Sequence, residues 1–81
     1  MHSGTFNITI KLFAHYREGR FADREQEVPD GTVIGDVIRS LGIDEDRLPL
    51  GIILLNGRHR KMDFALSDGD VLAIFPKVGG G

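Results

Sequence analysis

The residues best suited to chemistry in this chain form its last stretch, Phe75-Pro76-Lys77-Val78-Gly79-Gly80-Gly81. Glycine has no Cβ, tolerates positive φ and lets the backbone of another molecule approach closely. Pro76 has no N–H with which to continue a β-ladder, so we expect the sheet to stop there. The five residues after it would reach up to about 16–18 Å when extended. The pattern predicts a compact body that presents a thin arm.

Other side chains with catalytic or metal-binding potential fit simpler roles. The absence of cysteine excludes a disulfide, a thiolate zinc site and a cysteine nucleophile. Asp68 and Asp70 flank Gly69, and we interpret them as turn formers rather than as a catalytic pair. The three histidines share no metal-ligand spacing and are interpreted as surface residues: His2, His15 and His59. We therefore expect no metal site.

The composition is that of one ordinary globular domain. The chain has 81 residues, 41% of them hydrophobic and 27% charged, which is typical of soluble proteins. A net charge of −2 argues against general nucleic-acid binding. We find no signal peptide and no apolar run near the ~18 residues that cross a membrane. We expect a cytoplasmic protein that binds neither nucleic acid nor a membrane.

Alternating apolar residues predict several strands. Residues 6–13 alternate cleanly, and residues 21–28 form a more polar strand suited to a sheet edge. Ile52–Leu55 is apolar throughout, as in a strand covered on both sides, or on one side with a partner on the other. A hairpin turn at Asn56-Gly57 leads into a strand over residues 58–62. Val71–Phe75 is the last predicted strand.

One helix is expected after a turn at Pro29-Asp30-Gly31, followed by an acidic connection over residues 43–50. Thr32 can cap the helix, and Gly42 can end it in a left-handed conformation with Ile43 folding back. We place Gly35 on its outer face. The apolar face comprises Val33, Ile34, Val37, Ile38 and Leu41. The order β-β-α-β-β-β predicts an α+β fold in which one helix covers one face of a mixed sheet.

The basic residues after the Asn56-Gly57 turn and the aromatic residue Phe75 each have two possible interpretations. Arg58, Arg60 and Lys61 form a basic hairpin tip that carries either solvated charge or a docking surface. Phe75 is either a core residue or an anchor for a partner. If Phe75 is exposed together with Phe13 or Leu55, we expect an interaction patch.

Together these features resemble the ubiquitin-like β-grasp sulfur carriers of the MoaD/ThiS type, most closely the small subunit of molybdopterin synthase (MoaD). The resemblance implies a mixed sheet of four to five strands with one main helix on one face. It also implies a β-grasp domain over residues 1–76 and a flexible tail over residues 77–81. The matching pieces are Leu12-Phe13-Ala14, Arg17-Glu18, Pro29-Asp30-Gly31-Thr32-Val33, Leu41-Gly42, Leu55-Asn56-Gly57, Leu66-Ser67-Asp68-Gly69-Asp70 and the glycine arm.

The resemblance further implies the chemistry of the Gly81 carboxylate. A ubiquitin-activating-type adenylyltransferase (MoeB- or ThiF-like) would adenylate it with ATP, because a carboxylate is a poor electrophile and AMP is a leaving group. Sulfur from a donor such as a cysteine desulfurase or rhodanese would then give a thiocarboxylate. Within a MoaE-like large subunit, that sulfur would build the dithiolene of the molybdenum or tungsten cofactor. The implied partner-binding residues are Phe75, Pro76, Lys77, Val78, Gly79 and Gly80.

By the same resemblance the chain alone is not catalytic and holds no permanent cofactor. The residues Phe75-Pro76-Lys77-Val78 before the glycines favour the molybdopterin type. The alternatives are a ThiS-like carrier for the thiazole of thiamin, or for another thiocarboxylate-dependent pathway and its sulfur-acceptor enzyme. A covalent protein modifier joined through Gly81 to lysines, and a non-covalent ubiquitin-like binding module, are further alternatives.

Overall fold

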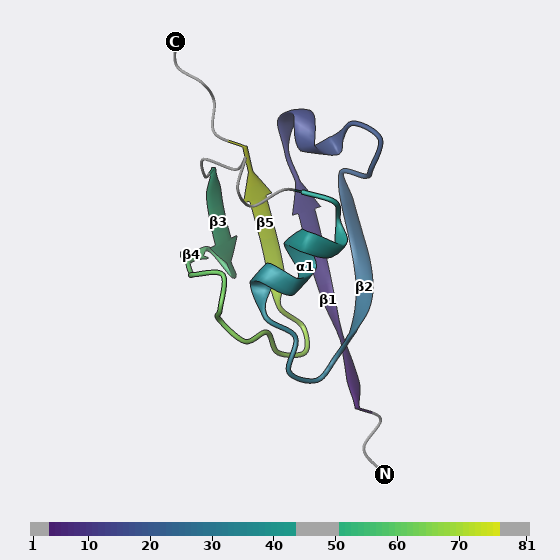
Figure 1. The fold of residues 1–81 in the computed structure, drawn as a ribbon, viewed down its shortest axis with the longest axis vertical. Coiled ribbons are helices and arrows are strands. Elements are labelled where there is room, and N and C mark those ends of the chain that lie inside the picture. The colour runs from purple at the N-terminus through teal and green to yellow at the C-terminus, as the bar shows by residue number, and fades with distance from the viewer. Residues whose placement is uncertain (1–3, 44–50, 77–81) are drawn as a thin grey trace.

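A computed structural model describes residues 4–43 and 51–76, with the backbone alone at His15. One turn of 3-10 helix, η1, follows the first strand, and a short α-helix, α1, packs on the sheet (Figure 1). The elements in chain order are β1 (Thr5–Leu12), η1 (Ala14–Arg17), β2 (Asp23–Pro29), α1 (Ile34–Ser40), β3 (Ile52–Leu55), β4 (Arg58–His59) and β5 (Val71–Phe75).

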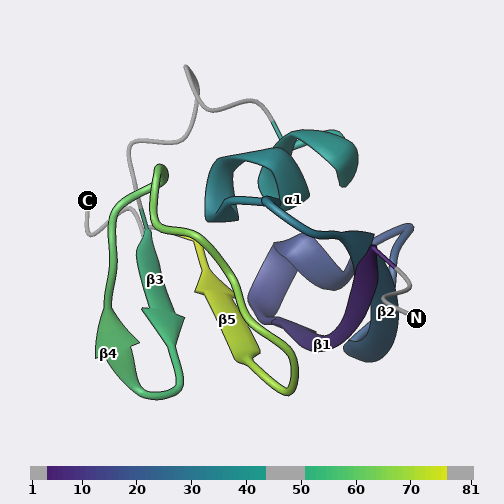
Figure 2. The same cartoon turned by 90° about the horizontal axis from the view of Figure 1, so that it is seen from below.

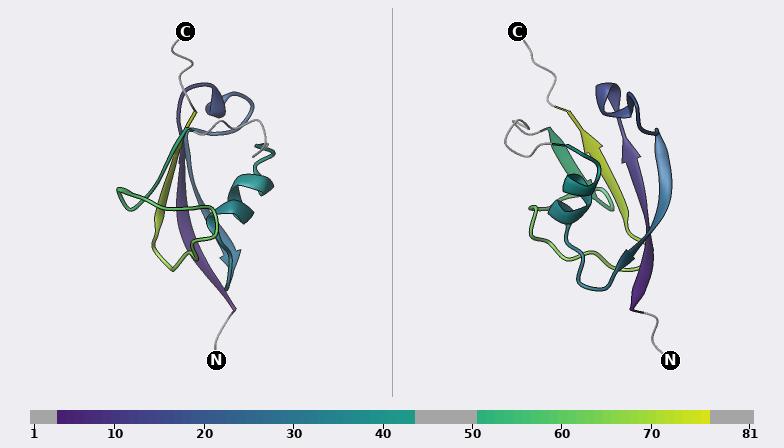
Figure 3. Two further views of the ribbon diagram at one scale, coloured as in Figure 1. Left: turned by 60° about the vertical axis from the view of Figure 1, so that its left-hand side comes forward. Right: turned by 45° about the vertical axis from the view of Figure 1, so that its right-hand side comes forward.

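The five strands form one mixed sheet in the order β2-β1-β5-β3-β4. Its central pair, β1 and β5, is parallel, and the other pairs are antiparallel. Figures 2 and 3 show α1 lying across one face of this sheet. The predicted α+β fold, with one helix on a mixed sheet, is confirmed. No helix within residues 4–43 and 51–76 is long and apolar enough to cross a membrane.

The core lies between α1 and the sheet. The strand register brings Leu72 of β5 opposite both Ile10 of β1 and Leu55 of β3. Ile34 and Ile38 of α1 pack against this layer, and both are fully buried. Each such aliphatic side chain contributes roughly 1.5–3 kcal/mol when buried. The alternation predicted for residues 6–13 is confirmed, because Ile8, Ile10 and Leu12 are all buried.

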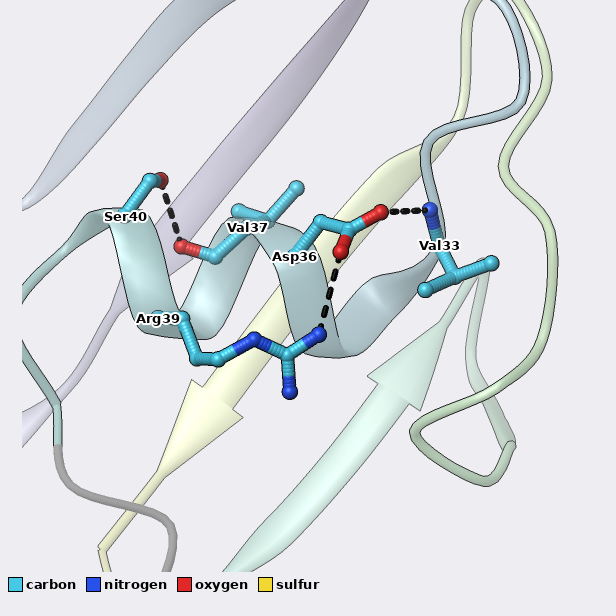
Figure 4. A network of polar contacts seen from close by, with 5 residues as sticks. All are labelled: Val33, Asp36, Val37, Arg39 and Ser40. Carbon is cyan, nitrogen blue, oxygen red and sulfur yellow. Dashed lines mark hydrogen bonds and ion pairs between the residues drawn. The ribbon is translucent and has the colours of Figure 1, made fainter.

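The N-terminus of α1 differs from the prediction. Thr32 does not cap the helix, because its buried hydroxyl donates a hydrogen bond to the Pro29 carbonyl at 2.6 Å. The cap position falls one residue later, on Val33. The Asp36 carboxylate accepts the Val33 N–H at 3.0 Å and pairs with Arg39 at 3.0 Å (Figure 4). These bonds hold the pKa of Asp36 below its ordinary value, with the Val33 N–H as the larger cause.

Gly35 is buried, so its predicted place on the outer face of the helix is wrong. Its N–H donates to the Met62 carbonyl at 2.8 Å, and the Ile34 N–H donates to the Phe64 carbonyl at 3.1 Å. The chain after β4 therefore satisfies the free N–H groups at the start of α1. Because the chain near Met62 and Phe64 bonds to the start of α1, it does not continue β4, and the strand predicted over residues 58–62 is only two residues long.

The C-terminus of α1 follows the prediction. Gly42 has φ +77°, and its N–H donates to the Arg39 carbonyl at 3.0 Å. The Ile43 N–H donates to the Ile38 carbonyl at 3.3 Å, which completes the left-handed ending typical of helices. The acidic connection predicted after this point falls mostly on residues 44–50, outside the described residues.

Candidate functional site

The face of the sheet opposite α1 carries an apolar surface that no other described element covers. β3 and β5 pair Ile52 with Phe75 and Leu54 with Ala73, which places these four side chains on that face. Ile52 is 48% exposed, so the described part of the chain does not cover β3 on both sides, contrary to one of our two predictions. We define the open-face patch as Phe13, Ile52, Leu54, Val71, Ala73 and Phe75.

A stack of three side chains stands at one end of this patch. The rings of Phe13 and Phe75 lie 4.1 Å apart between centroids, with planes inclined by 8°. The Arg17 guanidinium lies 5.6 Å from the centroid of Phe13 and donates from Nε to the Leu12 carbonyl at 2.9 Å. Since Phe75 ends β5, the stack stands where the chain leaves the sheet toward residues 77–81.

The 3-10 turn η1 positions this stack. We expected a plain loop over residues 14–20, but Ala14–Arg17 forms one turn of 3-10 helix. Tyr16 from this turn is buried in the core, which raises the pKa of its phenol. The buried ring fixes the turn, and the turn places Arg17 over Phe13.

The predicted site residues divide between the body and the arm. Phe75 is partly exposed and belongs to the open-face patch, while Pro76 is buried. Leu55 lies in the core on the opposite face, so it does not join Phe13 and Phe75. The remaining predicted residues lie outside the described residues and stay predictions: Lys77, Val78, Gly79, Gly80 and Gly81.

Charges of opposite sign flank the open-face patch. On the β2 side, the register puts Asp23 and Glu25 beside Lys11 and Thr9 of β1. On the β4 side lies the basic hairpin, where the Arg60 guanidinium lies 4.6 Å from the Phe64 ring centroid. An apolar centre within a charged rim is the usual anatomy of a protein interface.

A hollow of about 470 Å³ in the basic hairpin is lined by His59, Arg60, Lys61, Asp63 and Phe64.

The remaining polar candidates have structural roles. The Asp68 carboxylate accepts the Asn7 N–H at 3.0 Å. The Asp70 carboxylate accepts the Ser67 N–H at 2.8 Å and the Asn56 amide at 2.9 Å. Their interpretation as turn formers is confirmed. Among the described residues, no group of three or more histidine or acidic side chains could hold a metal ion.

Sequence reasoning missed the contact of Arg17 with Phe13. Arg17 follows Phe13 by four residues, a spacing that brings side chains together only in a helical turn. We predicted a loop there, so this contact was not foreseen. The apolar run of β3 did signal a partner on one side, and Ile52 and Leu54 are its residues on the open face.

Comparisons with known proteins agree with this architecture. Residues 10–81 match the ThiS family. Small archaeal modifier protein 3 of Haloferax volcanii is 38% identical over 91% of this chain and 98% of its own length. The solution structure of the HVO 2177 protein of Haloferax volcanii superposes with a TM-score of 0.78 at 33% identity, covering 100% of this chain and 92% of that one. A putative molybdopterin converting factor, subunit 1, from Pyrococcus furiosus gives 0.70 at 28%, covering 90% and 99%.

Proposed function

The chain belongs to the ThiS family, and we propose on this premise that it is a ubiquitin-like carrier of sulfur. Its Gly81 carboxylate is activated as an adenylate and converted to a thiocarboxylate. The family match extends over residues 77–81 and therefore includes the glycine arm. The chain is not catalytic alone, since the activating enzyme and the sulfur acceptor supply the chemistry.

The observation that carries this proposal is the position of the open-face patch beside the start of the arm. Phe75 belongs to the patch and is the last residue of β5, and in the sequence Pro76 alone separates it from residues 77–81. A partner that covers the patch therefore also receives residues 77–81. Aromatic and aliphatic anchors at the centre of an interface usually supply most of its binding energy.

The reaction proceeds in two balanced steps. A Gly81 carboxylate oxygen bonds to the α-phosphorus of ATP, and pyrophosphate leaves. Hydrosulfide, which a thiol reductant releases from the donor protein's persulfide, then attacks the carbonyl carbon. A C–S bond forms and AMP leaves with the electron pair of the broken C–O bond, which gives the thiocarboxylate. Glycine at positions 79–81 suits both steps, because a backbone without Cβ can enter a narrow active site.

Two end uses of the activated terminus have specific support. The 28% identity to a putative molybdopterin converting factor subunit favours sulfur transfer in molybdopterin synthesis, with a MoaE-like large subunit as partner. The 38% identity to a small archaeal modifier protein favours a second function, in which Gly81 forms an isopeptide bond with lysines of other proteins. Both uses share the adenylate.

Intact mass spectrometry tests the proposal and separates the two uses. The protein is incubated with an adenylyltransferase of the ubiquitin-activating type from the same organism, ATP and sulfide. Exchange of one oxygen for sulfur at Gly81 supports the carrier, while ladders of conjugates on added protein support the modifier.

Gly80→Val should abolish both products without changing the unfolding midpoint. One alanine appended after Gly81 should do the same, whereas one alanine added before Met1 should change nothing. Full activity with the appended C-terminal alanine rejects the proposal.

A further inference from the structure

Gly51 is in unusually close contact with the main chain at the point where β5 ends. Ile52 pairs with Phe75, so Gly51 lies beside Pro76. A Cβ placed on Gly51 would overlap the Phe75 carbonyl oxygen, and it would lie 2.5 Å from the Phe75 carbonyl carbon and 2.8 Å from that of Pro76. Real Cβ atoms essentially never approach another atom within 3.0 Å. Because all three neighbours are backbone atoms, no side-chain rotation can relieve the overlap.

The other described glycines are explained differently. Six of them have positive φ, and five of these six have no atom within 4 Å of the place that a Cβ would occupy: Gly4, Gly19, Gly31, Gly57 and Gly69. Gly35 has ordinary φ, and a Cβ there would lie 3.3 Å from the movable Arg39 guanidinium and 3.3 Å from the Met62 carbonyl oxygen, which is a tight contact but not an overlap. Among the described residues, Gly51 is thus the glycine at which a Cβ would overlap backbone atoms.

We propose that Gly51 is a positioning residue that sets the direction in which the backbone at Pro76 leads out of the body. Pro76 is buried, its ring fixes φ, and the Gly51 backbone abuts it from the β3 side. The origin of the arm is therefore held in a fixed relation to the open-face patch. This inference rests on the proposed function, since the direction matters only when a partner binds the patch and receives the arm.

Gly51→Ala tests the inference, because its methyl group must displace the backbone of Phe75 and Pro76. Misplacing a reacting group by about 1 Å can cost 10²-fold in rate. We therefore expect kcat for adenylate formation to fall by about tenfold or more, and by a larger factor than Kd for the adenylyltransferase rises through the displacement of Phe75. Gly35→Ala is the matched control, since it adds the same methyl group at a buried glycine of ordinary φ. Its kcat should equal that of the wild type.

The measurements are ATP–pyrophosphate exchange, Kd by calorimetry, the unfolding midpoint and backbone chemical shifts of residues 72–76. If the wild-type protein gives no exchange, the proposed function is rejected. The contact of Gly51 with Phe75 and Pro76 is then tested by the chemical shifts, which Gly51→Ala should change. In an active system, wild-type kcat for Gly51→Ala overturns the inference. If affinity and kcat fall by the same factor and the unfolding midpoint is also lower, the inference is overturned, because a purely structural defect acts that way.

A second variant covers the case in which Gly51→Ala does not fold. Two glycines inserted between Pro76 and Lys77 leave the body intact, and they uncouple the residues after them from the backbone direction at Pro76. This insertion should lower kcat with Kd unchanged, and wild-type kcat would contradict the inference. The wild-type protein must also show a nuclear Overhauser effect between the Gly51 and Pro76 α-protons, and its absence in solution rejects the contact.

Discussion

Phe13 and Phe75 stack face to face with ring centroids 4.1 Å apart, although they come from opposite ends of the sequence. Phe13 follows β1 and Phe75 ends β5, and these two strands are the parallel pair at the centre of the sheet. The stack therefore joins the end of the central pair to the point where the arm begins. An aromatic pair of this kind contributes about 0.5–1.5 kcal/mol beyond the area it buries.

Phe13→Ala should weaken both partner binding and the fold. The change removes the stack on Phe75 and the support beneath Arg17, so we expect the free energy of unfolding to fall by about 1–2 kcal/mol. The affinity for the adenylyltransferase should fall about tenfold or more, as for an aromatic anchor. Phe64→Ala is the control, because Phe64 also lies beneath an arginine but belongs to the basic hairpin. Equal losses of affinity in the two variants would argue against the patch.

Ile52→Glu should separate binding from stability. Ile52 is 48% exposed, so the unfolding free energy should change by no more than about 0.5 kcal/mol. A charge at the centre of an apolar interface should lower the affinity about 30-fold or more. Calorimetric titration and denaturant unfolding measure the two quantities. Phe64→Glu serves as the control at another exposed apolar residue, and an Ile52→Glu protein that binds normally excludes β3 from the interface.

The sequence predicted the fold well because its signals were local. The alternation in residues 6–13, the glycine at the end of the helix and the Asn56-Gly57 turn each determine a backbone conformation within a few residues. The errors arose where another group competes for the same atoms. Thr32 could cap the helix, yet its hydroxyl bonds to Pro29, three residues earlier. Gly35 is buried because a distant segment, around Met62, packs on the start of the helix.

The candidate site was predicted only in part for the same reason. Phe75 and Pro76 were identified from their place before the glycines, and no distant contact was needed. The stack of Phe13 on Phe75, and the contact of Gly51 with Phe75, depend on the pairing of β5 with β1 and β3. Such pairings join residues far apart in sequence, and no local pattern identifies the contacts that they create.

Leu72→Ala should destabilise the body without altering the chemistry of the arm. Leu72, the second residue of β5, is fully buried, so truncation should cost about 2–5 kcal/mol in unfolding free energy. Val71→Ala, one residue away and partly exposed, should cost less than about 1.5 kcal/mol. Urea unfolding gives both values. At temperatures where Leu72→Ala remains folded, its kcat for adenylate formation should match that of the wild type, and a specific loss of kcat would place Leu72 in the site.

Asp36 should make the stability of the protein depend on acid pH. The Val33 N–H and then the Arg39 guanidinium lower the pKa of its carboxyl group in the folded state. A lowered folded pKa favours the charged form, so the stabilisation is present above the ordinary aspartate pKa and is lost as pH falls through the folded pKa. Asp36→Asn keeps an acceptor for Val33 but does not titrate, while Asp36→Ala removes the acceptor. Urea unfolding from about pH 7 to about pH 2.5 should show a steeper decline for the wild type than for either variant. Parallel curves for wild type and Asp36→Asn would show that the contact with Val33 does not stabilise the charged carboxylate.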